Sequence, residues 1–392
     1  MKFYSADYVL PVTSSPIKDG IIAVNEAGKI LEIFSPQNLS PENSLQVEKH
    51  KGLIVPGFVN AHCHLELSHL YKKIDQGEGL IPFIRKIISS RSDFSEEVIR
   101  EAMDRADREM WENGIVAVGD ISNSSVSKQV KQNSQIYYHT FLELIGFNPE
   151  KANHVYEAGL KLKEAFGSLP ASLVPHASYS VCKELLKLIN ANCVESECVL
   201  SIHNQESEEE NKFYRYKTGG FLDFYQSINV PIGFFKPQAR NSLQSIIPLL
   251  VKESKVMLVH NTYTSLKDIY FVRRFIKEIT WCFCPGANLY IEQRLPKIDF
   301  FLFDDFNITL GTDSLASNTG LSIFNELKLL HENFTDINLE ETISWATLNG
   351  AKALKISDRF GSLDPGKTPG LNLITNTKGL KLTKDSKVLK LV

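Results

Sequence analysis

The segment Val55-Pro-Gly-Phe-Val-Asn-Ala-His-Cys-His64 is an apolar run that ends in two histidines separated by one residue. A short apolar run of this kind predicts a buried β-strand. Because residues i and i+2 project from the same face of a strand, His62 and His64 would lie side by side, and Cys63 would point away. Two imidazoles placed in this way can bind one metal ion. The segment therefore predicts a strand that carries half of a metal site.

Short β-rich runs and helical patterns alternate along the chain after this segment. The β-rich runs cover residues 115–118, 136–142, 172–175, 199–203, 255–260, 281–284 and 308–311. The helical patterns include residues 95–111, with Ser95 as the N-cap, 155–166 and 339–354. Strand-then-helix alternation predicts an α/β fold with a parallel sheet, and this number of strands fits a (β/α)8 TIM-like barrel over residues 55–360.

Both ends of the chain are β-rich. Residues 20–24 and 29–34 predict a hairpin, and residues 370–375, 378–382 and 388–392 predict further strands. The turn-rich stretch 363–370 marks a boundary between this region and the barrel. We therefore expect a small β-sandwich domain that is built from both chain ends, residues 1–54 and 361–392.

Composition and charge restrict the classes of partner. The formal net charge is −3 over 392 residues, which gives no electrostatic argument for binding nucleic acid or an anionic membrane. Uninterrupted apolar stretches are too short for a membrane span, and the first residues lack the apolar core of a secretory signal. We expect a cytoplasmic protein whose partner is a small-molecule substrate, and a homodimer is left open.

The cysteines point to the same compartment. They are Cys63, Cys182, Cys193, Cys198, Cys282 and Cys284. Six cysteines are too few for a disulfide scaffold in a chain of this length. We therefore expect free buried thiols in a reducing cytoplasm.

Polar residues that can bind a metal end several of the expected strands. His203, His260 and Asp313 each follow an apolar run, as His62 and His64 do, and His176 follows residues 172–175. The carboxyl ends of barrel strands form the rim that holds the active site in such folds. Four nitrogen and oxygen ligands with an open position describe a catalytic zinc site, and the same ligands suit iron or manganese. Asp313 taken alone could instead be a helix N-cap.

Four blocks carry a resemblance to a known family. The segments GLIVPGFVNAHCHLELS, IHNQESEEE, LVHNT and LGTDSLASN resemble signature blocks of the amidohydrolase superfamily, in its deaminase and chlorohydrolase branch. The likeness extends from about residue 50 to residue 366. It implies one metal ion bound by His62, His64, His203 and Asp313. It also implies that Glu206 carries protons, that His260 polarises the attacking water, and that His176 meets the substrate.

The implied mechanism is hydrolytic. A divalent metal lowers the pKa of a water molecule from about 15.7 toward 7, so that hydroxide forms at neutral pH. Asp313 would take the proton of that water, Glu206 would protonate a ring nitrogen, and His260 would stabilise the developing charge.

The chain departs from the family pattern at several positions. The block Cys284-Pro-Gly-Ala-Asn288 keeps Asn288, which we expect to contact substrate, but changes the loop. After His203 the usual Leu-Ala is replaced by Asn204-Gln205. Residues 172–176 end in Pro-His without the lysine of two-metal members. The resemblance therefore implies a single metal.

The sequence indicates less about the substrate than about the metal site. The stretches around Glu66 and Arg85 resemble the aminofutalosine deaminase group, in which both residues would face the substrate. Alternatively, Glu66 supports other site residues and Arg85 is a surface charge on a helix. The resemblance implies deamination of an aminated N-heterocycle, such as the 6-aminopurine nucleosides aminofutalosine, adenosine or a 5′-thio derivative. Two alternatives stay open: a hydrolase of a cyclic amide or another C–N or C–Cl bond, and a non-catalytic barrel scaffold.

Overall fold

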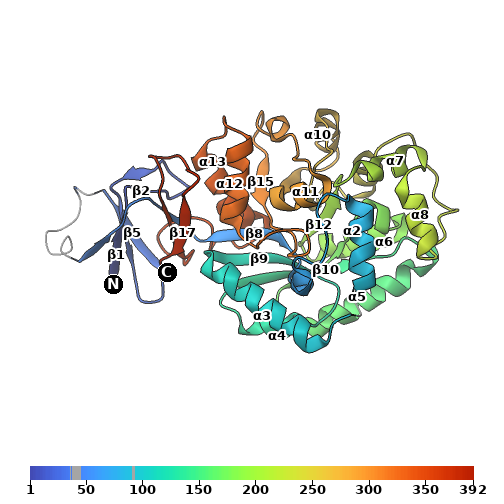
Figure 1. The fold of residues 1–392 in the computed structure, drawn as a ribbon, viewed down its shortest axis with the longest axis horizontal. Coiled ribbons are helices and arrows are strands. Elements are labelled where there is room, and N and C mark those ends of the chain that lie inside the picture. Colours follow the sequence, from blue (N-terminus) through green and yellow to red (C-terminus); the bar gives the residue numbers. More distant parts are fainter. Residues whose placement is uncertain (36, 38–45, 91–92) are drawn as a thin grey trace.

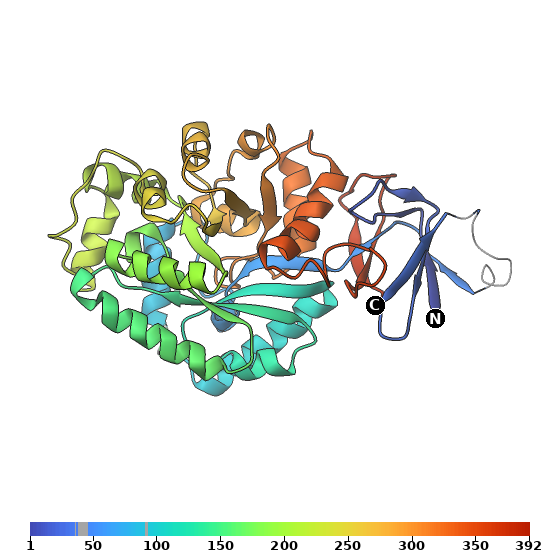
Figure 2. The ribbon, with the colours of Figure 1, turned by 180° about the vertical axis from the view of Figure 1, so that it is seen from behind.

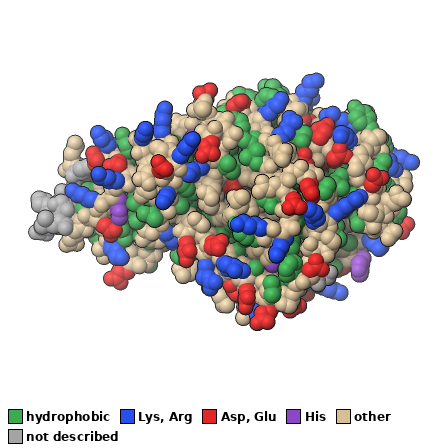
Figure 3. Space-filling model, in the orientation of Figure 1, with side chains coloured by type: hydrophobic (Ala, Val, Ile, Leu, Met, Phe, Trp, Pro, Cys, Tyr) green, Lys and Arg blue, Asp and Glu red, His purple; other side chains and the backbone are tan. Residues whose placement is uncertain are grey.

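The structure is a computed structural model that describes residues 1–35, 37, 46–90 and 93–392. It consists of a large unit of alternating strands and helices with a smaller β-rich unit beside it (Figure 1). Both chain termini lie in the smaller unit, as the view from behind also shows (Figure 2). Basic and acidic side chains are interspersed over the face drawn in Figure 3, in keeping with the small net charge.

The large unit is built on two four-stranded parallel sheets, with the orders β11-β10-β9-β8 and β12-β13-β14-β15. The strands are β8 (Phe58–Cys63), β9 (Ile115–Ser122), β10 (Tyr137–Leu144), β11 (Ala171–Pro175), β12 (Val199–Asn204), β13 (Lys255–His260), β14 (Glu278–Phe283) and β15 (Asn307–Leu310). Isolated parallel bridges, Cys63–Asp313 and Ala177–His203, link the edges of the two sheets. Both bridges lie at the carboxyl ends of the strands.

Helices surround these strands (Figures 1 and 2). They are α2 (Leu80–Ser90), α3 (Glu96–Glu112), α4 (Lys128–Asn133), α5 (Ala152–Phe166), α6 (Lys183–Glu195), α7 (Glu208–Tyr216), α8 (Gly220–Ser227), α9 (Ser242–Ile246), α10 (Leu266–Val272), α11 (Pro285–Glu292), α12 (Ile323–Asn333), α13 (Leu339–Ala346) and α14 (Leu348–Ala353). The alternation of strands and helices expected from the sequence is confirmed.

The sequence predicted the start of one helix correctly and the length of another wrongly. The Ser95 hydroxyl accepts a hydrogen bond from the amide of Val98 at the start of α3, as predicted. The single helix predicted for residues 339–354 is wrong, because the structure has α13 and α14 instead. Thr347 lies between them with non-helical dihedrals, and its hydroxyl donates to the carbonyl of Ile343 at 2.6 Å. This side-chain bond takes a backbone acceptor that a continuous helix would use.

The smaller unit contains two sheets. One sheet has the order β5-β4-β1-β6, with β1 (Lys2–Ser5), β4 (Ile21–Val24), β5 (Ile30–Phe34) and β6 (Val47–Lys49). The other has the order β17-β16-β7-β2-β3, with β2 (Tyr8–Val9), β3 (Ile17–Lys18), β7 (Leu53–Pro56), β16 (Leu371–Thr375) and β17 (Lys387–Lys390). The predicted hairpin is β4 and β5, and side chains from both sheets, among them Ile22 and Leu371, share one hydrophobic cluster.

The two chain ends meet in this unit through the antiparallel pairing of β16 with β7. The strand predicted at residues 378–382 is wrong, because this stretch forms a turn in which the Lys378 amide donates to Lys381 and Gly379 has a φ of 56°. The boundary predicted at residue 54 falls inside β7.

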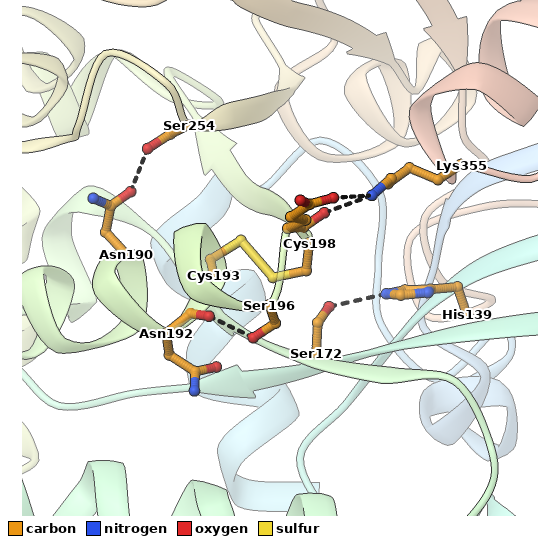
Figure 4. The surroundings of a disulfide bond; sticks show 10 residues. His139, Ser172, Asn190, Asn192, Cys193, Ser196, Cys198, Ser254 and Lys355 are labelled. Carbon is orange, nitrogen blue, oxygen red and sulfur yellow. Dashed lines mark hydrogen bonds and ion pairs between the residues drawn. A yellow bond between two sulfur atoms is a disulfide. The ribbon is translucent and has the colours of Figure 1, made fainter.

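The expectation that all cysteines are free is wrong for one pair. Cys193 near the end of α6 and Cys198 just before β12 form a disulfide (Figure 4). Their Cα atoms lie 5.0 Å apart, within the range that a disulfide can bridge, because the chain turns back after the helix. Cys63, Cys182 and the two remaining cysteines are free and buried, as expected.

Among the helices of the described residues, none has the length and apolar character needed to cross a bilayer.

A buried ion pair connects α4 to β9. The Lys131 ammonium lies 2.6 Å from Asp120 Oδ2, and both side chains are fully buried. Lys131 also donates to the hydroxyls of Ser122 and Thr140, and Asp120 Oδ1 accepts from the amide of Leu65. The pair therefore supports the turn that follows His64.

Replacing Lys131 by Met should destabilise the protein by about 3–5 kcal/mol, because the Asp120 carboxylate is left buried without its counter-charge. Urea unfolding of the wild type and the variant measures this difference. An Asp120→Asn/Lys131→Met protein, which has no buried charge at this place, should recover part of the loss. A single variant as stable as the wild type would contradict this assignment.

Candidate active site

Four ligand atoms converge at the carboxyl ends of β8, β12 and β15. They belong to His62, His64, His203 and Asp313, and all lie within 4.8 Å of one another. His64 Nε2 is 3.2 Å from the Nε2 atoms of both other histidines and 3.3 Å from Asp313 Oδ1. An ion about 2.0 Å from each of four tetrahedral ligands separates those ligands by about 3.3 Å. The spacing therefore fits one divalent metal ion.

The backbone brings Asp313 to the two histidines of β8. The amides of Thr312 and Asp313 both donate to the carbonyl of His62, at 3.0 and 3.1 Å. Gly311 makes this approach sterically feasible, since a Cβ there would lie 2.7 Å from the Cβ of His62. Asp313 itself has a φ of 57°, in the left-handed region, which aspartate adopts more readily than most other non-glycine residues. Asp313 is no helix N-cap, because the next helix, α12, is capped by Ser322.

Neighbouring groups orient two of the four ligands. His203 Nδ1 donates to the carbonyl of His176 at 2.8 Å, which leaves Nε2 of His203 for a metal. Asp313 Oδ2 accepts from the Ser317 hydroxyl at 2.5 Å, which leaves Oδ1 facing the histidines. Such hydrogen bonds to the far side of a ligand fix its tautomer and direction.

Burial sets the protonation states that metal binding needs. It lowers the pKa of His64 to about 3, although the charge of Asp313 acts in the opposite direction. Burial would raise the pKa of Asp313, but the hydrogen bond with His62 and the charges of His64 and His260 hold this pKa well below its usual value. At neutral pH the site therefore offers a neutral His64 imidazole beside an ionised carboxylate, the forms in which both residues bind metals.

Glu206 and His260 lie on the same wall of the site. Glu206 Oε1 is 3.7 Å from His260 Nε2, and both side chains are buried. Burial, followed by the charges of Asp313 and two other carboxylates, raises the pKa of Glu206 well above its usual value. Glu206 is thus suited to hold a proton at neutral pH, as a general acid requires.

Asn288 orients the His260 ring. The amide of Asn288 donates to the Thr262 hydroxyl, which leaves Oδ1 to accept from His260 Nδ1 at 3.0 Å. Burial lowers the pKa of His260 to about 4, so the ring is neutral at pH 7. Its Nε2 has no hydrogen-bond partner among the described residues. This atom is therefore available to a molecule in the cavity.

A cavity of about 380 Å³ opens over these groups. Its polar end is lined by His64, His176, His203, Glu206, His260 and Asp313. Its other part is apolar and is lined by side chains of α2, α8 and the segment after β10, among them Ile84, Ile87, Phe147, Phe224 and Ile228. The cavity therefore fits a molecule with a polar, reacting end and an apolar extension.

Of the four residues expected to contact substrate, one lines the cavity and three do not. His176 lines the cavity, and its Nδ1 is hydrogen bonded to the Ser180 hydroxyl. Glu66, Arg85 and Asn288 are not among the lining residues. Arg85 is exposed on α2, and Glu66 accepts hydrogen bonds from the loop after β9, including the amide of Asn123.

Glu143 is a site residue that the sequence reasoning missed. It is the penultimate residue of β10 and lines the cavity, with Oε1 3.5 Å from His203 Nδ1. Asn123, at the end of β9, also lines the cavity and donates to the Glu143 carboxylate. The sequence could have indicated Glu143, because site residues are expected at the carboxyl ends of parallel strands, but the strand expected here ended at residue 142. Glu143, His176 and His203 form a second group of adjacent ligand atoms, in which His203 Nδ1 is already bonded to the carbonyl of His176.

Comparison with known proteins defines the class. Residues 53–392 match the model of the amidohydrolase family. The chain therefore belongs to the amidohydrolase family, as the signature blocks indicated, and is a hydrolase of carbon–nitrogen bonds other than peptide bonds.

Particular relatives narrow this class. Adenosine deaminase of Helicobacter pylori is 27% identical over 372 residues, which cover 92% of this chain and 88% of that protein. The crystal structure of Helicobacter pylori aminofutalosine deaminase in complex with methylthio-coformycin has a TM-score of 0.83 at 22% identity, and all of both chains is covered. An adenosine deaminase from Xanthomonas campestris with bound zinc has a TM-score of 0.73 at 19% identity, with 95% of this chain and 84% of that chain covered. The two structural matches establish a common fold.

Glu326 links the Asp313 loop to α11 and makes stability depend on pH. Its carboxylate accepts from the amide of Gly286 and from Asn318, which also donates to the carbonyl of Thr312. Burial raises the pKa of Glu326 from 4.5 to about 7. A raised pKa in the folded state means that stability is fully present below pH 4.5 and is lost as the pH rises through 7.

The unfolding free energy of the wild type, relative to that of Glu326→Gln, should therefore fall by about 3 kcal/mol between pH 4.5 and pH 7. The comparison isolates this carboxyl, since the other titrating groups are common to both proteins. Chemical unfolding at several pH values measures the difference, and parallel curves for the two proteins would contradict the prediction.

Proposed function

We propose that this chain is a metal-dependent aminohydrolase that removes the amino group of a 6-aminopurine nucleoside such as aminofutalosine, adenosine or a 5′-thio derivative. The observation that carries the proposal is the position of Glu206 beside His260, on the wall of the cavity that also holds the four ligand atoms. A scaffold protein would need neither side chain there. The names of the relatives and the coformycin ligand of the Helicobacter pylori structure support the same reaction.

The proposal includes the finer architecture. We interpret the two parallel sheets as a closed (β/α)8 barrel over residues 55–360, because bridges join their edges at both sides. We interpret the two sheets formed by residues 1–54 and 361–392 as a β-sandwich domain, because they share a hydrophobic cluster.

One divalent metal ion is part of the proposal. His62, His64, His203 and Asp313 would hold it, and their nitrogen and oxygen atoms suit zinc first, with iron or manganese as alternatives. When bound, the ion supplies a Lewis acid that lowers the pKa of a water molecule toward about 7.

The side chains perform the proton transfers. The Asp313 carboxylate would accept a proton from the attacking water. His260 Nε2 is left as an acceptor because Nδ1 donates to Asn288, so it would orient this water by accepting a hydrogen bond from it. Only after gaining a proton would the ring stabilise the charge that develops during the attack. Glu206 would donate its proton to the ring nitrogen beside the attacked carbon. It would then take the remaining proton of the added hydroxyl and pass it to the amino group, which leaves as ammonia when the C–N bond breaks, and the proton accepted by Asp313 would restore the acid form of Glu206.

The remaining residues that the sequence assigned to substrate binding would take no part in proton transfer. We propose that His176 contacts the substrate directly, because it lines the cavity. Asn288 would act through His260, and Glu66 through Asn123. Arg85 would meet a substrate only if α2 moved, since it is exposed.

A homodimer and a cytoplasmic location stay predictions. Sedimentation of the purified protein tests the first. The Cys193–Cys198 disulfide weighs against a reducing compartment, because disulfides are rare in the cytosol.

Purified protein should contain about one equivalent of zinc, iron or manganese and should release ammonia from a 6-aminopurine nucleoside. Elemental analysis and the change in ultraviolet absorbance from adenine to hypoxanthine measure the two outcomes. The substrates to compare are aminofutalosine, adenosine, S-adenosylhomocysteine and methylthioadenosine, with adenine and guanine as free bases. If all of these are inert and a cyclic amide is hydrolysed, the alternative hydrolase is the correct function.

Glu206→Gln should lose turnover by about 100-fold or more while it keeps its metal, because the amide has the shape of the acid but no acidic proton to transfer. Elemental analysis of the variant is the control for an intact site. An active Glu206→Gln protein would refute the role given to this residue.

Ile87 should favour a substrate with an apolar 5′ group. Ile87→Asn should lower kcat/KM for methylthioadenosine by about 10-fold more than for adenosine, since a methyl-sized contact in an apolar pocket contributes about 1–3 kcal/mol. Ser89→Asn on the same helix is the matched control, because Ser89 is exposed and does not line the cavity. Equal losses for the two substrates would contradict the assignment of the apolar part to the 5′ group.

A further inference from the structure

Two polar residues precede Glu206 where the family pattern has Leu-Ala. Asn204 and Gln205 are both fully buried. A buried amide group costs free energy unless its hydrogen bonds are satisfied, so two of them beside a reacting carboxyl need a structural reason. The proposed reaction uses neither side chain.

Asn204 connects β12 to the residue that follows His260. The side-chain amide of Asn204 donates to Asn261 Oδ1 at 3.0 Å. The backbone carbonyl of Asn204 accepts from the backbone amide of Asn261, also at 3.0 Å. Asn261 in turn donates to the carbonyls of Leu258 and Cys282. One buried side chain therefore joins the ends of β12, β13 and β14.

Gln205 connects the Glu206 turn to the same region. Gln205 Oε1 accepts from the Thr264 hydroxyl at 2.8 Å. The backbone carbonyl of Gln205 accepts from the backbone amide of Tyr263 at 2.9 Å. On the other side, Gln205 Nε2 donates to Asn211 of α7 at 3.2 Å. The residue before Glu206 is thus held to the residues after His260 by both its backbone and its side chain.

The backbone at these turns is under strain. Gln205, His260 and Asn261 have φ values of 44°, 73° and 58°, all in the left-handed region. Each such residue costs of order 1 kcal/mol and persists only where surrounding contacts determine the conformation. The hydrogen bonds of Asn204, Gln205 and Thr264 are those contacts.

We propose that Gln205, together with Thr264, is a positioning residue that holds the Glu206 carboxyl against His260. The inference rests on the proposed function, because it assigns the contact a role in proton transfer by Glu206. Removing the Gln205–Thr264 hydrogen bond leaves the two turns held by fewer bonds, so that small shifts between them lengthen the path between the Glu206 proton and a substrate. Small displacements of this kind lower kcat, since proton transfer depends on distances fixed to a few tenths of an ångström.

Two variants test the proposal from opposite sides of the bond. Gln205→Met keeps the length of the side chain and the strain of the backbone but removes both hydrogen bonds. Thr264→Val removes the hydroxyl and keeps the shape. Each should lower kcat by about 10- to 100-fold with KM within about threefold of the wild type and with metal content unchanged. Because both remove the same bond, the double variant should lose little more than the worse single variant.

Two controls separate positioning from general stability. Thr264→Ser keeps the hydroxyl and should keep kcat. Ser254→Ala removes a comparable buried bond, from Ser254 to Asn190 at 2.7 Å, at the opposite end of β13 (Figure 4). This control should lower Tm without changing kcat. If Gln205→Met and Thr264→Val also lower only Tm, or if their losses in kcat simply multiply, the proposal is overturned.

Failure of the proposed function gives a different result. A wild type that is inert on every aminopurine refutes the deaminase assignment and says nothing against the positioning role. Crystal structures of the wild type and Gln205→Met then decide, since the proposal expects the separation of Glu206 Oε1 and His260 Nε2 to change from its 3.7 Å. An unchanged separation, with Glu206 and His260 in place, would overturn it.

Discussion

The junction between β8 and β15 is the constraint on which the site depends. Two amides, those of Thr312 and Asp313, donate to the one carbonyl of His62, and Gly311 leaves room for the approach. This contact joins residues about 250 positions apart, so no local segment can form it alone. Its entropy cost is met by the folding of the whole set of parallel strands. Where the junction forms, His62 Nε2 lies 3.6 Å from Asp313 Oδ1.

The same junction creates an electrostatic demand. An ionised Asp313 is buried beside histidines that burial keeps from carrying full charge, as the low pKa of His64 shows. A buried carboxylate with neutral neighbours is poorly compensated. A divalent cation at this place supplies the missing charge and uses the lone pairs that the imidazoles offer. The burial and charge of these side chains therefore favour a divalent cation at this place, independently of the reaction.

The sequence predicted the ligands far better than the substrate contacts, for a physical reason. Strand periodicity and strand ends determine where His62, His64, His203 and Asp313 point, and the structure brings these four together. Glu66, Arg85 and Asn288 lie in helices and turns, where the direction of a side chain depends on tertiary contacts that no local pattern encodes. Asn288 was expected at the substrate and instead holds His260. The Cys193–Cys198 bond and the break at Thr347 were missed for the same reason, since both depend on how the chain turns after a helix.

The residues that would carry out the reaction and those that would select the substrate lie in different parts of the cavity wall. Its polar end comes from strand ends, which the parallel ladders and the junction hold rigidly. Its apolar part comes from α2, α8 and the segment after β10, which add side chains to the rim without bearing on the ligands. Substitutions in these outer segments can therefore alter which molecule fits while the metal ligands, Glu206 and His260 stay in place. This division explains why signature blocks on the strands identify a hydrolase of carbon–nitrogen bonds, whereas the identity of the substrate depends on residues outside those blocks.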